Sequence, residues 1–273
     1  MTKFIIFIIL LNNIHGAFSQ TEIISNEKLK NDLTIFRQIR ESGNSGLYKY
    51  KTKNQIDSIY KWAETEIQKP KTIIEFYNII CQLTDFEGSV HNNTRLPKDI
   101  IKAFGETNGY FPFPVKLING DLLINISNTE IPLASKIIKI NDIEIDQIIK
   151  SVRKYYTTDG INITGKSIGI NSVFPKYYKY EFGTFDEFKI EYYEPYSTIK
   201  IVKNIKSVSN KIRYEQFLNR HSKNVDSLNY ANFKKDDKYK FELKNKDLAI
   251  LSVKLSTSEV TKMHESTKST KKN

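Results

Sequence analysis

The chain has 273 residues, 39% of them hydrophobic, which is enough for one large domain or two to three small ones around a packed core. The single cysteine, Cys81, excludes an intrachain disulfide framework, and four scattered histidines make a multi-histidine metal centre a poor candidate. The formal net charge of +11 comes with lysines spread along the whole chain. Because no nucleic-acid-binding motif accompanies that charge, we expect a solvated basic surface and no nucleic-acid partner.

The first residues have the pattern of a secretory signal peptide. Lys3 precedes an apolar run from Phe4 to Leu11, and Ala17-Phe18-Ser19 has the small-residue spacing of a cleavage site. A bilayer span needs roughly 20 apolar residues, so this run is too short to cross a membrane. We therefore predict that residues 1–19 are a signal peptide and that the protein is extracytoplasmic, either periplasmic or secreted.

Residues 20–105 are predicted to form a helical region. Apolar residues recur at helical spacing in three segments, the first of which contains Leu29 and Leu33. Thr52 or Asn54 is the expected N-cap of the second helix. Thr72 begins the third, with Glu75 in the position that completes a capping box.

A β-rich pattern replaces the helical one after Pro112. Two short apolar runs on either side of Asn119-Gly120 predict a hairpin, because Asn-Gly favours the tight turn between antiparallel strands. Lys136–Ile140 predicts a further strand, and residues 146–155 return to helical spacing. These elements together predict a β-rich module over residues 106–160.

Residues 161–246 are expected to be a strand-rich connecting region, because the first half is rich in Tyr, Phe and Ile. The clearest runs are Phe188–Tyr193 and Thr198–Val202. Leu248–Val253 predicts one last strand, and the Ser, Thr and Lys residues that follow predict a disordered tail. The expected fold class is therefore α+β, with a helical N-terminal region followed by a β-rich module and a strand-rich segment.

Three stretches carry a resemblance to a known family, and they occur in the family's order. The stretch from Thr72 to Pro97 contains Gly88-Ser89-Val90-His91 and resembles the helical entry of the tail-specific (C-terminal-processing) serine peptidases, in their tricorn-core and retinoid-binding-protein-like branch. Phe111–Ile149 resembles the PDZ-like module of that family. Leu248–Lys254 resembles the first strand of its protease core, which makes residues 247–273 that strand plus a tail.

The PDZ-like stretch departs from the family pattern at two positions. Ala134 stands where glycine is usual, and Asp142 stands at a second glycine position. The resemblance implies a groove near Ala134 and Ser135 that binds peptide or protein segments, since an exposed sheet edge can accept a peptide as an extra strand. The alternative is a packing module without a ligand.

His91 matches the family's histidine, and the resemblance implies that it serves as the base for a serine nucleophile. A neutral imidazole suits that role near pH 7. The last twenty residues contain no Gly or Ala and hold no nucleophile elbow, so we expect the protease core to be truncated. The alternative is a loop histidine without a catalytic role.

These observations predict a secreted serine-type peptidase homologue that lacks the nucleophile-bearing core and is inactive alone. The alternative is a non-enzymatic extracytoplasmic protein that binds peptides in the PDZ-like groove. A third hypothesis is an envelope protein attracted to anionic polymers by its charge. No metal and no cofactor are expected.

Overall fold

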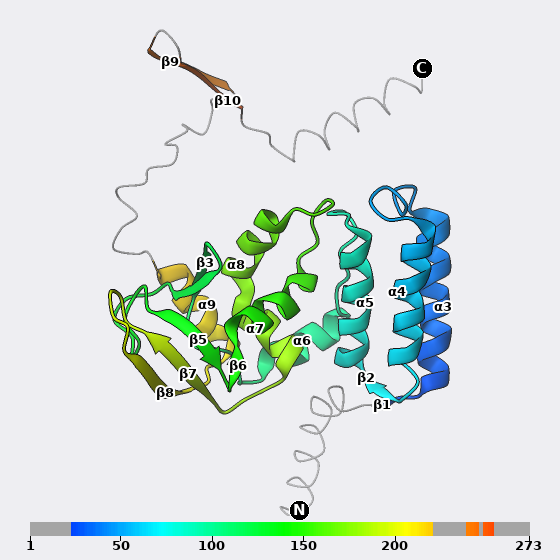
Figure 1. The fold of residues 1–273 in the computed structure, drawn as a ribbon, viewed down its shortest axis with the longest axis horizontal. Helices are drawn as coiled ribbons and strands as arrows, with labels where there is room; N and C mark the ends of the chain where they lie inside the picture. The colour runs from blue at the N-terminus through cyan, green and yellow to red at the C-terminus, as the bar shows by residue number, and fades with distance from the viewer. Residues whose placement is uncertain (1–22, 221–238, 246–247, 254–273) are drawn as a thin grey trace, which may run out of the picture. The chain divides into compact units, whose positions relative to one another are not determined.

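The computed structural model describes residues 23–220, 239–245 and 248–253, and the first range belongs to one compact unit (Figure 1). The predicted signal peptide and the predicted tail after Val253 lie outside the described residues. The fold is α+β, as the sequence predicts, with a helical N-terminal region followed by an antiparallel sheet. The predicted division into domains stays a prediction.

The N-terminal helices pack side by side around their own hydrophobic cluster, which includes Leu29, Ile56 and Leu83. The N-cap predictions at Thr52 and Thr72 are confirmed, and each threonine forms a capping box with the residue three positions on. A capping box satisfies backbone N–H groups that the first helical turn leaves free. The elements of this region are β1 (Ile23–Ile24), α3 (Asn26–Gly43), α4 (Lys53–Glu66), β2 (Lys71–Thr72) and α5 (Ile73–Glu87).

The main sheet is antiparallel throughout, with strand order β3-β4-β5-β7-β8 and with β6 paired to β5. The predicted hairpin is confirmed: Asn119 and Gly120 have φ values of 51° and 92° and join the first two strands. Because β7 pairs with β5, the sheet continues beyond the predicted end of the module at residue 160. The strands are β3 (Val115–Ile118), β4 (Asp121–Ile124), β5 (Lys136–Ile140), β6 (Ile143–Glu144), β7 (Glu187–Tyr193) and β8 (Lys200–Lys206). The strand predicted at Phe188–Tyr193 is confirmed as β7, and the one predicted at Thr198–Val202 overlaps the first half of β8.

Residues 163–182 form the long helix α8 (Ile163–Phe182), so the strand-rich character expected from residue 161 onwards is wrong for this segment. Asn162 caps the helix by accepting a hydrogen bond from the N–H of Gly165. The spacing of four between Ile170, Phe174 and Tyr178 places three fully buried side chains on one face. That helical periodicity decides the structure over the strand preference of individual aromatic residues.

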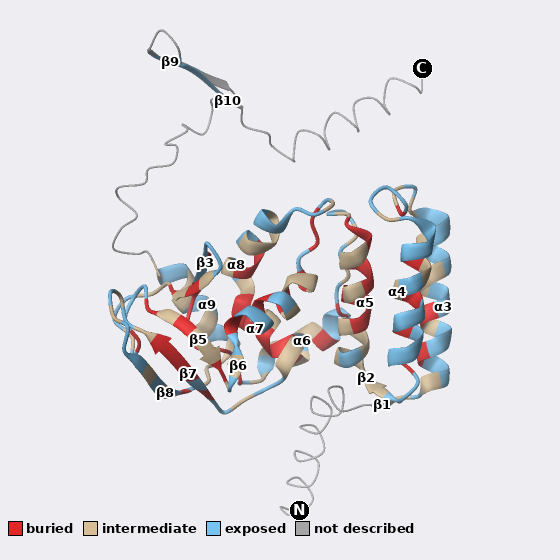
Figure 2. Ribbon diagram, in the orientation of Figure 1, coloured by how far each residue is buried: buried red, intermediate tan, exposed pale blue. Residues whose placement is uncertain are grey.

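The larger hydrophobic cluster lies between α8 and the sheet (Figure 2). The ring of Phe111 makes edge contacts with Phe174 of α8 and Phe188 of β7, at centroid distances of 5.5 and 5.4 Å. Helix α8 thereby joins the sheet to the rest of the compact unit. The remaining helices of this unit are α6 (Lys98–Glu106), α7 (Ile145–Val152), the 3₁₀ turn η1 (Arg153–Tyr155) and α9 (Asn210–Asn219).

Residues 239–253 belong to a second unit, which is described by itself. Strands β9 (Tyr239–Asn245) and β10 (Leu248–Val253) form an antiparallel hairpin, and the predicted last strand is confirmed. Its place in a protease core stays a prediction.

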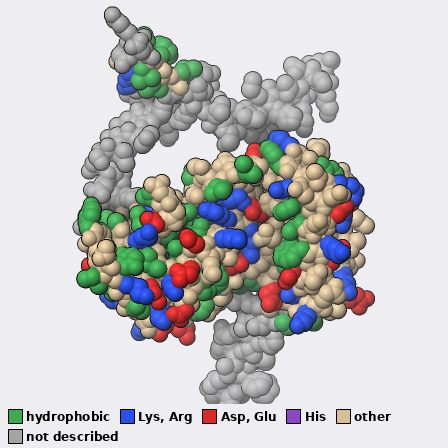
Figure 3. Space-filling view, viewed as in Figure 1, with side chains coloured by type: hydrophobic (Ala, Val, Ile, Leu, Met, Phe, Trp, Pro, Cys, Tyr) green, Lys and Arg blue, Asp and Glu red, His purple; other side chains and the backbone are tan. Residues whose placement is uncertain are grey.

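Charge is distributed over the surface rather than gathered in one basic block on the face that Figure 3 shows. Lys and Arg side chains alternate there with Asp and Glu. Among the described residues, no helix combines the length and the apolar character that crossing a membrane requires.

Lys179 of α8 is fully buried and makes no ion pair with a carboxylate among the described residues. Its ammonium group donates hydrogen bonds to Thr107 Oγ1 and to the Asn108 carbonyl oxygen, each at 2.6 Å, just beyond the end of α6. Burial disfavours the charged form and lowers the pKa of Lys179 from 10.5 to about 8.

We expect the free energy of unfolding to rise by up to about 2 kcal/mol between pH 8 and pH 10 because of Lys179. In this range the unfolded chain keeps a proton on the lysine and the folded chain releases it, so higher pH favours the folded state. Urea unfolding at several pH values measures the slope.

Lys179→Met removes this contribution, whereas the control Lys102→Met, at an exposed position on α6, keeps it. The difference between variant and wild type is the measure, because burial raises the pKa of the Cys81 thiol to about 12 and this group adds an opposing slope to every variant. The same pH dependence in the wild type and in Lys179→Met contradicts the prediction.

Candidate functional site

The loop that carries His91, residues 88–97, is fixed to the body of the compact unit on both sides of the histidine. The N–H of Gly160 donates to the Gly88 carbonyl oxygen at 2.8 Å, and the N–H of Val90 donates to Asp159 Oδ1 at 3.1 Å. Beyond His91, the hydroxyl of Tyr77 donates to the Thr94 carbonyl oxygen at 3.2 Å. These hydrogen bonds give an exposed loop a defined backbone position.

The loop begins at a buried ion pair. Glu87, the last residue of α5, is 1% exposed and forms a two-point ion pair with the guanidinium of Arg40 on α3. Gly88 follows with a φ of 73°, a left-handed conformation that glycine adopts without steric cost and that ends the helix. The ion pair and the glycine together set the direction in which the loop leaves α5.

His91 itself lies in a turn of this loop and is exposed to solvent. Among the described residues, no serine hydroxyl and no carboxylate forms a hydrogen bond with its imidazole. A catalytic histidine acts on a nucleophile within hydrogen-bond reach and is held by a second group. The base role of His91 therefore stays a prediction.

Two cavities of the compact unit have volumes of about 380 Å³ and about 460 Å³, and the larger of these two adjoins the His91 loop. This larger cavity, which we call the tyrosine pocket, is lined by loop residues on both sides of His91, among them Val90, Asn93 and Arg95. Its other walls come from α5, from α6, from the end of η1 with the two residues after it, and from α8. Five tyrosines contribute to these walls: Tyr77, Tyr155, Tyr156, Tyr177 and Tyr180.

The tyrosines support one another as a packed group. The Tyr155 ring stacks on Tyr77 and Tyr177 at centroid distances of 6.0 and 5.2 Å. Its hydroxyl lies 2.7 Å from the carboxylate of Glu181, to which it donates a hydrogen bond. Burial and the Glu181 charge raise the pKa of Tyr155, and burial raises the pKa of Tyr177 to about 12. These hydroxyls are therefore protonated donors at neutral pH.

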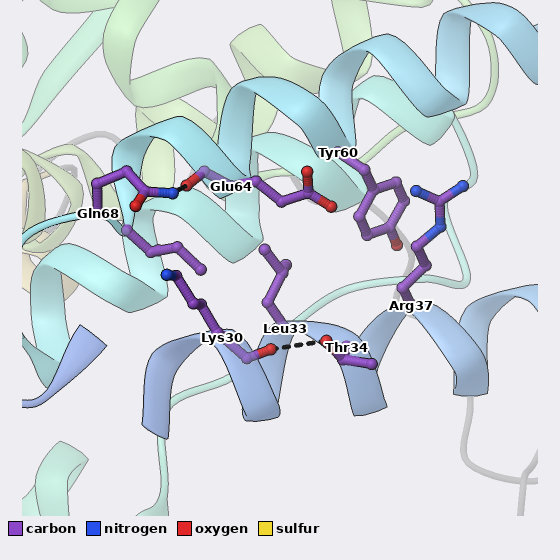
Figure 4. Close-up of a pocket in the computed structure, with 8 residues that line it drawn as sticks. Lys30, Leu33, Thr34, Arg37, Tyr60, Glu64 and Gln68 are labelled. Carbon is purple, nitrogen blue, oxygen red and sulfur yellow. Dashed lines mark hydrogen bonds between the residues drawn. The ribbon is translucent and has the colours of Figure 1, made fainter. Parts of the chain in front are cut away.

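The smaller cavity lies between α3 and α4 (Figure 4). Its floor contains Tyr60, whose hydroxyl is buried without a hydrogen-bond partner in the described part of the chain. Arg37 lies over the Tyr60 ring at 4.9 Å, and its guanidinium forms ion pairs with Glu41 and Asp57. Because Arg37 is already neutralised by two carboxylates, this cavity is a weaker candidate for an anion site than the tyrosine pocket.

Ala134 and Ser135 lie in the turn that precedes β5. This strand is not at an edge of the sheet, because it pairs with β4 on one side and with β7 on the other. The Ala134 N–H donates to the Ile124 carbonyl oxygen at 2.9 Å, and the Ser135 carbonyl accepts from the Ile124 N–H at 3.0 Å. The turn's main-chain groups are thus engaged with the end of β4. Ser135 is fully buried, and its hydroxyl has no partner among the described residues. Their role in binding peptides stays a prediction.

The predicted site residues lie on different elements, and no hydrogen bond in the described residues joins His91 to the turn at Ala134 and Ser135. Sequence reasoning missed the tyrosine pocket. The signal was available in Tyr155-Tyr156 and in Tyr177 and Tyr180, but it required the helical assignment of α8. Within the described ranges, no group of three or more His, Cys, Asp and Glu side chains is arranged to hold a metal ion.

No protein-family model matches this chain, and no curated protein matches it in sequence. Among solved structures, the crystal structure of mature CPAF is similar, with a TM-score of 0.45 and 10% identity over 67% of this chain and 34% of that chain. The crystal structure of a serine-to-alanine mutant of CPAF gives a TM-score of 0.41 and 11% identity with the same coverage. This chain thus spans about a third of the length of those chains. A likeness at this TM-score does not assign an activity.

We expect Ala134→Gly to stabilise the protein by about 1 kcal/mol. Ala134 has a φ of 65°, a left-handed conformation that costs an L-residue roughly 1–2 kcal/mol, and part of the gain is lost to the greater freedom of glycine in the unfolded chain. Denaturant unfolding measures the difference. Ala103→Gly, in α6, is the matched control and is expected to destabilise. A loss of stability in Ala134→Gly contradicts the prediction.

Proposed function

We propose that this chain is a secreted serine-type peptidase homologue and that its described part binds extended polypeptide segments. The peptidase lineage is supported by the ordered resemblance of three sequence stretches. The export of the protein is supported by the signal-peptide pattern in residues 1–19. The polypeptide-binding role is carried by one structural observation, the open edge of β8.

Strand β8 is seven residues long and pairs with β7 on one side only, among the strands that the structure describes. The pairing pattern identifies which main-chain groups face outward. The N–H of Ser207 donates to the Asp186 carbonyl oxygen at 2.9 Å, so this pair is hydrogen-bonded. Since hydrogen-bonded and non-hydrogen-bonded pairs alternate in an antiparallel ladder, the N–H and C=O groups of Val202 and Asn204 point away from β7.

The neighbouring strand supports this assignment. Val202 is paired with Glu191, and Asn204 is paired with Lys189. The N–H of Asn141 donates to the Lys189 carbonyl oxygen at 2.8 Å, so Lys189 directs its main-chain groups towards β5 and away from β8. The outward-facing groups of β8 are therefore free to pair with an added strand.

The side chains at this edge indicate which polypeptides fit. Val202 is 50% exposed and offers an apolar contact to a residue of an added strand on the same face of the sheet. Lys200 and Lys206 share the face of Val202. Lys200 lies 3.1 Å from Glu191, and Lys206 is the lysine of β8 that has no ion pair among the described residues. Since a cross-strand acidic residue is favoured opposite a lysine, we infer a preference for extended segments that carry both apolar and acidic residues.

We expect Val202→Pro to weaken the binding of such peptides about tenfold or more. Proline removes the outward-facing N–H and obstructs the edge, while the hydrogen bonds between β7 and β8 remain because the Val202 N–H does not contribute to them. Fluorescence anisotropy of short labelled peptides with alternating valine and glutamate measures the affinity.

Val202→Thr is the matched control, because it changes the side chain and keeps the N–H. Circular dichroism and thermal unfolding verify that both variants are folded. Equal affinity in Val202→Pro and the wild type, or a wild type that binds none of these peptides, contradicts strand addition at β8.

We further propose that this chain alone does not hydrolyse peptides. The support is that no serine hydroxyl among the described residues is hydrogen-bonded to His91, and acyl transfer needs an activated nucleophile and donors for the oxyanion. A fluorophosphonate probe and a labelled casein assay on the purified chain test this. We expect no labelling and no release of fragments above the rate of His91→Ala. Covalent labelling of a serine, lost in His91→Ala, overturns this part of the proposal.

A further inference from the structure

The tyrosine pocket carries positive charge without a matching carboxylate. Arg95 from the His91 loop and Lys176 from α8 both line the pocket, and neither forms an ion pair in the part of the chain that the structure describes. Arg213 of α9 lies close enough to Lys176 to add to the positive field. Its guanidinium is hydrogen-bonded to Asn210 Oδ1 at 2.8 Å, a neutral partner.

Two other lysines, one in η1 and one on α8, are by contrast held by carboxylates. Lys154 is paired with Glu181 at 2.7 Å, and Lys166 is paired with Asp85, so these two carboxylates are already occupied, and no carboxylate of the described residues lines the pocket itself. Burial and the charges of Arg213 and Arg95 all lower the pKa of Lys176. An anion bound in the pocket would offset the repulsion among Lys176, Arg95 and Arg213. It would also compensate the Lys176 ammonium group for the hydration that burial removes.

The walls add hydrogen-bond donors and aromatic surface. Among the described residues, the hydroxyls of Tyr177 and Tyr180 have no hydrogen-bond partner, and each is available to donate to a bound oxygen. The Tyr156 ring is 37% exposed and offers a face for stacking. It is held in place by α8, because a Cβ at Gly169 would lie 2.1 Å from a carbon of this ring.

The size of the pocket limits the occupant. A volume of about 460 Å³ is in the range of small-ligand sites and is too small for a folded domain. Cations and tyrosine hydroxyls recognise carboxylate and phosphate oxygens by charge-assisted hydrogen bonds. Aromatic walls recognise a planar apolar body.

We propose that the tyrosine pocket binds a small ligand that joins an aromatic ring to a carboxylate or a phosphate, with Arg95 and Lys176 holding the anion and the tyrosines packing on the ring. This binding site requires only the geometry of the pocket and is independent of the peptidase lineage and of the β8 edge. Peptide binding at β8 and ligand binding in the pocket therefore succeed or fail separately.

Isothermal titration of the purified full chain with phenyl phosphate and with phenylacetate tests the proposal. Each probe carries a ring and an anion, and the comparison identifies whether phosphate or carboxylate is preferred. Benzyl alcohol keeps the ring without the charge, and inorganic phosphate keeps the charge without the ring. We expect at least one aryl anion to bind saturably and about tenfold more tightly than both controls, with affinity that falls as salt increases.

Lys176→Met and Arg95→Met are each expected to weaken the preferred aryl anion about tenfold, since each removes a charge-assisted contact. Arg95 is exposed and its replacement leaves the core intact, so this variant tests the proposal even where Lys176→Met is unstable. Lys61→Met, at an exposed position on α4, is the matched control and keeps wild-type affinity. The proposal is overturned by the absence of aryl-anion binding, by equal binding of benzyl alcohol, or by wild-type affinity in Arg95→Met.

Discussion

The ammonium group of Lys179 is buried against oxygens at the end of α6, and the position of α8 depends on this contact. Different faces of α8 contact different parts of the protein. Phe174 and Tyr178 pack against the sheet, Tyr177 and Tyr180 form a wall of the tyrosine pocket, and Lys179 closes the gap to α6. A buried lysine without a carboxylate is costly, so the surrounding hydrogen bonds must be well formed for the helix to keep its place. The pocket walls and the sheet core are therefore coupled through α8.

The two proposed binding regions use different physical means. At β8 the recognising groups are main-chain N–H and C=O groups, which accept many sequences and favour an extended conformation. In the tyrosine pocket the recognising groups are side chains on a helix and on an anchored loop, which favours one small shape. The anchoring of the loop at Gly88, Val90 and Thr94 keeps Arg95 on the rim of the pocket. His91 shares that loop, so any chemistry it performs takes place next to the pocket.

The parts of the fold that the sequence predicts correctly are those set by local rules. The capping threonines, the Asn119-Gly120 turn and the strand at Lys136–Ile140 each follow from residue types within a few positions. Helix α8 was missed because Gly165, Gly169 and Pro175 are usual helix breakers and the intervening residues favour strands. The tyrosine pocket was missed for a related reason: its walls come from segments about eighty residues apart, and only the packing of α8 brings them together.

The lysines of β8 have a consequence for the protein's own solubility. An unpaired strand edge invites a second copy of the same strand, and edge-to-edge association of that kind is a common route to aggregation. Lys200, Lys203 and Lys206 are distributed along β8, and the first two lie 3.1 and 3.8 Å from Glu191 and Glu130. Two antiparallel copies of β8 centred on Lys203 would still bring lysine opposite lysine, and like charges directly opposite are destabilising. The lysines therefore disfavour self-association at the same edge that we propose for a different polypeptide.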